Sequence, residues 1–150
     1  MNFKFKSIRD ELELKQYQVA DKINISRGAY ANIEAETANI KLNDLLTYCN
    51  EFDLSMDYVC NLTNKINRDL NKIKAIDKQV MASRLTQIEM EQNKLAKEIA
   101  EDIGVHPSTY SYYKNPSRPM LMQTLMLKHL CSKYGYSMDW IIGRSSKKHL

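Results

Sequence analysis

The fold of this chain is decided by the stretch from Lys15 to Glu34, which reads KQYQVADKINISRGAYANIE. Apolar residues recur there at helical spacing in two short runs, on either side of a polar turn. The two runs are Val19, Ala20 and Ile23, then Ala29, Tyr30 and Ile33. This pattern predicts two short helices joined by a tight turn.

Three positions in the stretch meet the demands of such a turn. Ala20 is small, as the crossing of two helices requires. Asn24 stands where the backbone is usually left-handed, and Asn tolerates that conformation better than any residue except Gly. Ser26 offers a side-chain oxygen to the amides that open the second helix. Together these residues indicate a helix-turn-helix.

The flanking sequence predicts three more helices around this motif. They are expected over residues 4–13, over residues 41–52, and in a short segment that Ser55 caps. The chain has only four Gly and three Pro in 150 residues, and this composition favours an all-α fold.

Residues 63–91 carry an apolar stripe that no Gly or Pro interrupts. The stripe consists of Ile66, Leu70, Ile73, Ile76 and Val80. It predicts one long helix, of which residues 63–80 would join two domains. Two interpretations are open: a connecting helix that lies on one or both domains, or a dimerisation helix that pairs in a short coiled coil.

The second half of the chain repeats the first. VADKINI at 19–25 matches IAEDIGV at 99–105, at an offset of 80 residues, and Gly104 stands where Asn24 does. RGAYANIE, which ends at Glu34, matches PSTYSYYK at the same offset.

Further on, SMDYV at 55–59 matches SMDWI at 137–141, and the offset is now 82. A two-residue insertion in NPSRPM at 115–120 accounts for the change. We therefore expect a first domain over residues 1–62 and a second, divergent one over residues 81–150.

The net charge of +4 is modest and unevenly spread. Residues 1–62 hold 7 basic and 10 acidic residues, residues 63–80 hold 5 and 2, and residues 81–150 hold 10 and 6. A nucleic-acid-binding protein usually shows a stronger basic bias. A DNA-binding role would require the first domain to place its few cations well.

Neither a secretory signal nor a membrane span is expected from the sequence. The three cysteines, Cys49, Cys60 and Cys131, are widely spaced and form no CxxC pair. This pattern favours reduced thiols in the core over a disulfide framework or a zinc site. We therefore expect a cytoplasmic protein.

Residues 5–61 resemble the lambda-repressor-like, or Xre/Cro, family of helix-turn-helix DNA-binding domains. The resemblance lies in IRDELELKQYQVADKINISRGAYANIE followed by LLTYCNEFDLSMDYV. Residues 84–143 resemble a second copy, with IAEDIGVHPSTYSYYKN as its core. The family is five-helical, usually binds operator DNA as a dimer and usually represses transcription. The resemblance thus implies two tandem five-helix domains.

In such domains the second helix of the motif lies in the major groove, and the first crosses the DNA backbone. The residues expected to face outward are Arg27, Gly28, Ala31 and Asn32. The fork of Arg27 suits a guanine edge, and Asn32 suits an adenine or a phosphate. Gly28 either allows a close approach to DNA or avoids a clash with a neighbouring helix.

Other residues of the first copy are expected to contact phosphates. Gln16 matches the family's glutamine at the start of the first motif helix, where the helix amides also favour an anion. Lys15 weakens the cap there but adds a cation, and Lys41 opens the fourth helix. For each lysine the alternative is a solvated surface charge. Ser26 completes the expected interface as the cap of the reading helix.

The second copy is expected to present its own set of outward residues. They are Pro107, Ser108, Thr109, Ser111, Tyr112 and Lys114. Ala96 replaces the glutamine, Lys97 can take over its contact, and His106 replaces the capping serine. Two interpretations are open: a second DNA-binding module, or a degenerate copy kept for dimerisation or protein binding.

The sequence argues against an enzyme, and no cofactor is expected. His106, His129 and His149 lack metal-ligand spacing, and there is neither a Gly-rich phosphate loop nor a nucleophile elbow. We expect a repressor of a bacterium, phage or mobile element that binds double-stranded DNA as a homodimer. The alternative is a protein-interaction module, such as an antitoxin or inhibitor, in which only one copy binds DNA.

Overall fold

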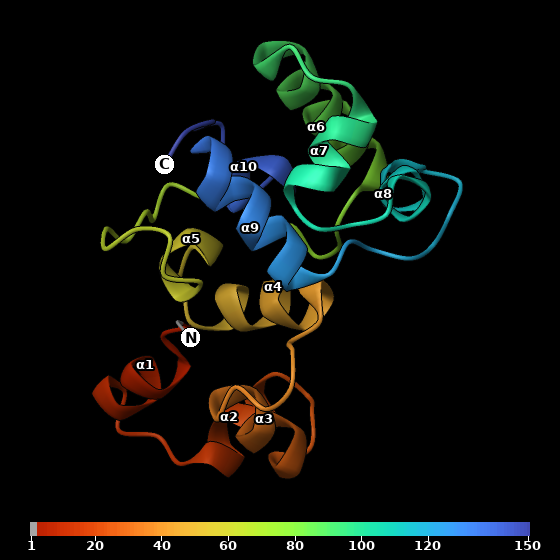
Figure 1. The fold of residues 1–150 in the computed structure, drawn as a ribbon. Coiled ribbons are helices and arrows are strands. Elements are labelled where there is room, and N and C mark those ends of the chain that lie inside the picture. The colour runs from red at the N-terminus through yellow and green to blue at the C-terminus, as the bar shows by residue number, and fades with distance from the viewer. Residues whose placement is uncertain (1–2) are drawn as a thin grey trace. The chain divides into compact units, whose positions relative to one another are not determined.

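The computed structural model describes residues 3–150, which contain ten α-helices and no β-strand. The chain divides into two compact units, residues 1–69 and residues 70–150. The first holds α1 to α5, coloured red to yellow in Figure 1, and the second holds α6 to α10, coloured green to blue. The predicted all-α class is confirmed.

The first unit packs five short helices around one apolar core. They are α1 (Phe5–Glu11), α2 (Gln16–Lys22), α3 (Arg27–Glu34), α4 (Leu42–Glu51) and α5 (Met56–Val59). The rings of Phe5 and Tyr48 meet edge to face at the centre, with centroids 5.0 Å apart. Tyr30 of α3 reaches the same ring of Phe5 from the other side, so α1, α3 and α4 share one core.

Serine caps begin two of these helices, as predicted. The Oγ of Ser26 accepts a hydrogen bond from the amide of Ala29 at 3.1 Å, and the Oγ of Ser55 accepts one from Tyr58 at 3.1 Å. Each cap satisfies one of the amides that a helix leaves unpaired at its start.

The prediction of one long helix from residue 63 is wrong. Residues 63–77 are not helical, and α6 begins only at Lys78, behind the capping carboxylate of Asp77. Local hydrogen bonds compete with the helix: Thr63 Oγ1 accepts from the amide of Lys65, and Asn67 Oδ1 accepts from that of Asp69. The expected connecting helix over residues 63–80 is therefore an irregular segment for most of its length, which also removes the coiled-coil interpretation.

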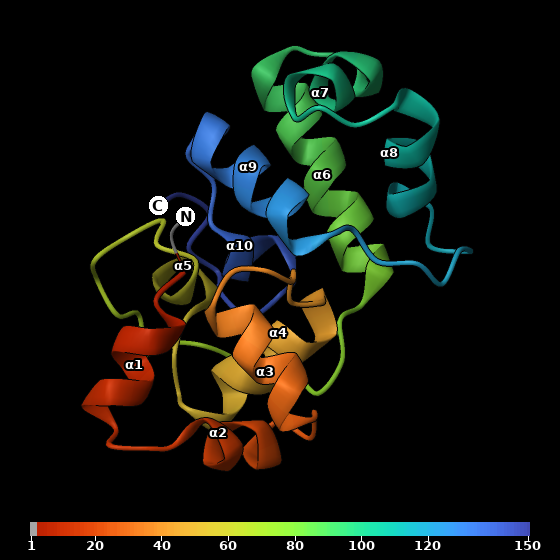
Figure 2. The same ribbon diagram turned by 60° about the horizontal axis from the view of Figure 1, so that its bottom comes forward.

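The second unit contains five helices that correspond to those of the first in order, although α6 has 15 residues and α1 only 7. They are α6 (Lys78–Gln92), α7 (Ala96–Asp102), α8 (Pro107–Lys114), α9 (Thr124–Tyr134) and α10 (Met138–Ile141). Helices α7 and α8 have 7 and 8 residues, as α2 and α3 do, and α5 and α10 have 4 each. Figure 2 shows α6 behind α7 and beside α8 within this unit.

The same backbone hydrogen bond occurs inside each unit, at positions 80 residues apart. The amide of Ile25 binds the carbonyl of Ala20 at 3.1 Å, and the amide of Val105 binds that of Ala100 at 2.9 Å. The turn residue is left-handed in both, with φ of 59° at Asn24 and 74° at Gly104. The internal repeat predicted from the sequence thus extends to the backbone of the turn.

Cys49, Cys60 and Cys131 are fully buried, as expected of core thiols. Among the described residues, none of the helices has the length and apolar character that crossing a membrane requires.

Candidate nucleic-acid interface

Helix α3 presents one buried face and one exposed face. Tyr30 and Ile33 are 0% and 7% exposed and hold the helix in the core. Arg27, Gly28 and Asn32 are exposed, and Ala31 is half-buried. These four residues lie on the face of the helix that the sequence predicted to point outward, although Ala31 is partly covered.

Gly28 lies in open space. A Cβ added at Gly28 would have no neighbouring atom within 4 Å, apart from its own helix and chain neighbours. Avoidance of a clash with a neighbouring helix, one of the two explanations considered above, is therefore wrong. Glycine costs about 0.5–1 kcal/mol relative to alanine inside a helix, and nothing within this unit explains why the residue is kept.

An ion pair fixes the end of α3 against α1. The guanidinium of Arg9 donates two hydrogen bonds to the carboxylate of Glu34, from Nη2 at 2.7 Å and from Nε at 2.8 Å. The same guanidinium donates to the carbonyl of Leu14 at 3.0 Å, ahead of α2. Arg9 thus joins α1 to the last residue of α3 and to the segment that precedes α2.

The Arg9–Glu34 pair is largely shielded from water. The Glu34 side chain is 5% exposed and the Arg9 side chain 16%. Burial alone would raise the pKa of Glu34, but the hydrogen bonds from Arg9 hold that pKa below its ordinary value. Sequence reasoning missed this pair, because the two residues are 25 positions apart.

Gln16 is tied to the same carboxylate. Its Nε2 donates to Glu34 Oε1 at 3.5 Å, and the residue is half-buried at the start of α2. Next to it, Tyr17 is 47% exposed, and its hydroxyl is a second polar group at the first turn of α2 that the sequence analysis did not single out. Lys15 precedes both residues and is exposed.

The cations of the first unit fall into two groups. Three form ion pairs within the unit: Lys6 with Asp10, Arg9 with Glu34, and Lys22 with Glu51. Lys4 lies over the ring of Tyr58, and Arg68 donates to the carbonyl of Asp53. Within described residues 3–69, the basic side chains that make neither an ion pair nor a side-chain hydrogen bond are Lys15, Arg27, Lys41 and Lys65.

Three of these four cations are the ones that the sequence assigned to the interface. Lys15 is the cap of α2, Arg27 opens α3, and Lys41 is the cap of α4. Each stands at or next to a helix N-terminus, where the partial positive charge of the helix adds to its own. The first unit has more acidic than basic residues, yet its uncommitted cations gather at the starts of three helices.

The second unit lacks these three cations and also differs at the other two positions of the predicted contact set. At the positions of Lys15, Gln16, Arg27, Asn32 and Lys41 it carries Leu95, Ala96, Pro107, Tyr112 and Gln123. Gln123 is the cap of α9 as Lys41 is the cap of α4. None of the five replacements is charged.

Two of the polar residues predicted for this second interface, Lys114 and Ser108, are engaged within the unit. Lys114 binds the carboxylate of Glu89, with Nζ 2.8 Å from Oε2. His106 caps α8 by accepting from the amide of Ser108 at 3.1 Å, and its Nδ1 lies 2.7 Å from the hydroxyl of that serine. Thr109 is half-buried, whereas Lys97 and Ser111 are exposed.

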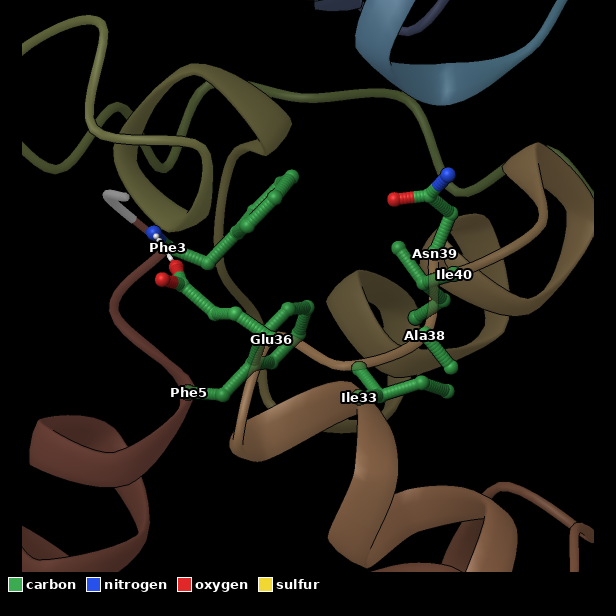
Figure 3. A pocket seen from close by; sticks show the side chains of 7 residues that line it. All are labelled: Phe3, Phe5, Ile33, Glu36, Ala38, Asn39 and Ile40. Atoms are coloured by element: carbon green, nitrogen blue, oxygen red, sulfur yellow. Dashed lines mark hydrogen bonds between the residues drawn. The ribbon is translucent and has the colours of Figure 1, made fainter.

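A small pocket lies beside the loop that follows α3. Figure 3 shows Phe3, Phe5 and Glu36 on one side of it, with Ala38, Asn39 and Ile40 on the other. The amide of Phe3 donates to Glu36 Oε1 at 2.9 Å on the first side of the pocket. Its volume of about 10 Å³ holds at most one water molecule, so it is too small for an organic effector.

Comparison with known proteins finds a family match for the first unit. Residues 5–59, which span α1 to α5, match the family model described as helix-turn-helix. A Bacillus subtilis (strain 168) protein, the uncharacterized HTH-type transcriptional regulator YobD, is 31% identical over 61 residues. This match covers 41% of the present chain and 54% of that relative. No solved structure matches the chain.

The predicted family resemblance is thus confirmed for residues 5–59. The family match stops before the second unit begins, so the second copy rests on the internal repeat alone.

Proposed function

We propose that this protein is a sequence-specific DNA-binding transcriptional regulator, and that α3 of its first unit reads the major groove. One observation carries the proposal: three of the unit's four uncommitted cations, Lys15, Arg27 and Lys41, stand at the starts of α2, α3 and α4, the first two of which form the motif. The helix-turn-helix match of residues 5–59 supports it, and the relative found is named a transcriptional regulator.

Each exposed residue has a distinct role in this proposal. Arg27 reads a guanine through its two donors, and Asn32 pairs with an adenine or a phosphate. Lys15 and Lys41 contact phosphates, which provide most of the affinity without providing sequence choice. Glu34 holds the side chain of Gln16 in position to contact the DNA backbone. Gly28 lets α3 approach the bases closely.

The regulator acts as a repressor by occluding a promoter, in the manner that the family resemblance implies. Binding as a homodimer would place two copies of α3 on half-sites about one helical turn, ~34 Å, apart.

The second unit fits the alternative role better than that of a second reader. Its positions that match the DNA-contacting set are uncharged, and Lys114 is paired with Glu89. Each phosphate contact requires a cation or a free donor, and the second unit offers few at this face. This loss favours a protein-interaction role for residues 70–150.

Selection of bound duplexes from a random pool, with the full chain as bait, tests the proposal. A DNA-reading α3 should enrich one short motif, and affinity for it should fall steeply with salt. Lys15→Ala and Lys41→Ala should each lower the slope of log K against log salt by about 1, whereas Lys6→Ala, at an ion-paired lysine of α1, should leave it unchanged. Failure to enrich any motif, together with no salt-sensitive binding, would refute a DNA-binding role.

A further inference from the structure

The two most exposed large apolar side chains among the described residues lie at one corner of the second unit. Met90, near the end of α6, is 76% exposed, and Leu95, the cap of α7, is 61% exposed. Exposed apolar groups of this size that lie close together mark interaction sites more often than isolated ones do. We call Met90 and Leu95, with the neighbouring outward residues Ser83, Thr86 and Gln87 of α6, the corner surface.

The fold does not require apolar residues at these two positions. In the first unit the same positions are held by Asp10 and Lys15, both exposed. The turn itself is the same, because the amide of Glu13 binds the carbonyl of Asp10 at 3.1 Å and that of Asn93 binds Met90 at 3.2 Å. The first unit therefore builds this turn with charged side chains, so Met90 and Leu95 are not needed to form it.

The face of α6 next to Met90 is shallow and nearly uncharged. A hollow of about 500 Å³ lies there, lined by Ser83, Thr86, Gln87, Met90 and Glu91. The carboxylate of Glu91 is already bound by the ammonium of Lys148 at 2.6 Å and by the hydroxyl of Tyr136 at 2.8 Å. Short polar side chains around a single Met leave room for another helix to approach this face.

The charges around the corner surface identify the occupant. On α7, Lys97 is exposed beside two exposed acids, Glu98 and Glu101. Two exposed carboxylates would repel phosphates, which disfavours DNA at this corner. A rim that carries both signs is complementary to itself, because under a two-fold axis Lys97 of one copy can face the acids of the other.

We propose that the corner surface is the homodimerisation interface of this chain. One of its two apolar residues, Leu95, stands where the first unit carries Lys15, a proposed phosphate contact. At this position the second copy carries an apolar side chain in place of a cation, and Leu95 binds another copy of the chain together with Met90. The DNA correspondence rests on the proposed function, whereas the dimer itself does not. The partner is a second copy of this chain, with Met90 and Leu95 of each subunit covered by those of the other.

Sedimentation equilibrium of the full chain, from about 1 to 100 µM, tests the proposal. The test variant combines Leu95→Lys with Met90→Asp, which installs the residues that the first unit carries at these positions. The control is Met120→Asp, which charges another exposed apolar residue of the second unit, 53% exposed. We expect the wild type and Met120→Asp to be dimers and the test variant to be a monomer, with the dissociation constant of the dimer raised at least about tenfold.

A wild type that stays monomeric to about 100 µM overturns the proposal, and so does a test variant that dimerises as the wild type does. Circular dichroism checks that the variant is folded, and if it is not, Leu95→Lys alone decides in the same assay. DNA binding is measured separately on the wild-type protein. Dimerisation without DNA binding would refute the proposed function and leave the interface standing, whereas DNA binding by a monomer would do the reverse.

Discussion

Glu89 and Lys114 form an ion pair at the positions where Arg9 and Glu34 pair in the first unit, with the two charges exchanged. Both residues lie 80 positions after their counterparts. In each unit the pair joins a first helix to the last residue of the second motif helix, and in the second unit the hydroxyl of Tyr110 also donates to Glu89, at 2.7 Å. The geometry is kept while the polarity is reversed.

The first unit should therefore tolerate an exchange of the two charges, with an acid at position 9 and a base at position 34. Arg9→Glu and Glu34→Lys, made singly, each leave two like charges in a shielded site and should lower the free energy of unfolding by about 3 kcal/mol or more. The double variant should recover most of that loss, because Glu89 and Lys114 show that the fold permits the exchange. Urea unfolding followed by circular dichroism measures all three. Additive losses in the double variant would show that the two pairs are not equivalent.

The same pair makes the stability of the first unit depend on pH. The folded-state pKa of Glu34 lies below its ordinary value of about 4.3, so its contribution is complete above that pH and is lost as the pH falls through the folded-state pKa. Glu34→Gln should be less stable than the wild type at pH 7, and the difference should shrink as the pH falls below about 4. A difference that stays constant down to pH 3 would show that the charge of Glu34 does not stabilise the fold.

Gly28 separates stability from DNA binding. Since a Cβ there meets no neighbour, Gly28→Ala should stabilise the free protein by about 0.5–1 kcal/mol. If α3 approaches the bases closely at this residue, the same variant should bind its selected duplex more weakly. Thermal unfolding and fluorescence-anisotropy titration measure the two effects on one preparation. Unchanged DNA affinity would remove Gly28 from the interface.

Gly104 tests the turn of the second unit. Its φ of 74° is strained for any β-branched residue, so Gly104→Val should cost about 1–3 kcal/mol. Gly104→Asn is the matched control, because Asn24 adopts the same conformation in the first unit. The chain's single tryptophan, Trp140, lies in α10, and its fluorescence in urea reports on the second unit. Equal midpoints for the two variants would contradict this account of the turn.

The parts of the fold that local chemistry controls could be predicted from the sequence. Asn24, Ser26 and Ser55 do what their residue types indicated, because a turn or a cap depends on a few neighbouring backbone groups. The helix expected from residue 63 failed for the same kind of reason. That prediction relied on the spacing of the apolar residues and gave too little weight to Thr63 and Asn67. The side chains of these two residues bind nearby backbone amides and so compete with a helix.

The candidate site could be predicted only in part, because ion pairs join residues that are distant in the sequence. Nothing near Lys114 indicated that Glu89 holds it, and nothing near Arg27 indicated that it makes no ion pair. One signal was present but unused. Positions 9 and 34 carry opposite charges, and so do positions 89 and 114, in reversed order, which is what two residues in contact would show.

The affinity ratio between the selected duplex and a random duplex, measured for the wild type and for Arg27→Ala, tests the central claim most directly. The account predicts that Arg27→Ala lowers this ratio roughly 5- to 150-fold, which corresponds to a loss of about 1–3 kcal/mol in discrimination. The free energy of unfolding should stay unchanged. Lys6→Ala, which removes an ion-paired cation of α1, should keep the wild-type ratio. A wild-type ratio in Arg27→Ala would contradict the claim that α3 of the first unit reads DNA.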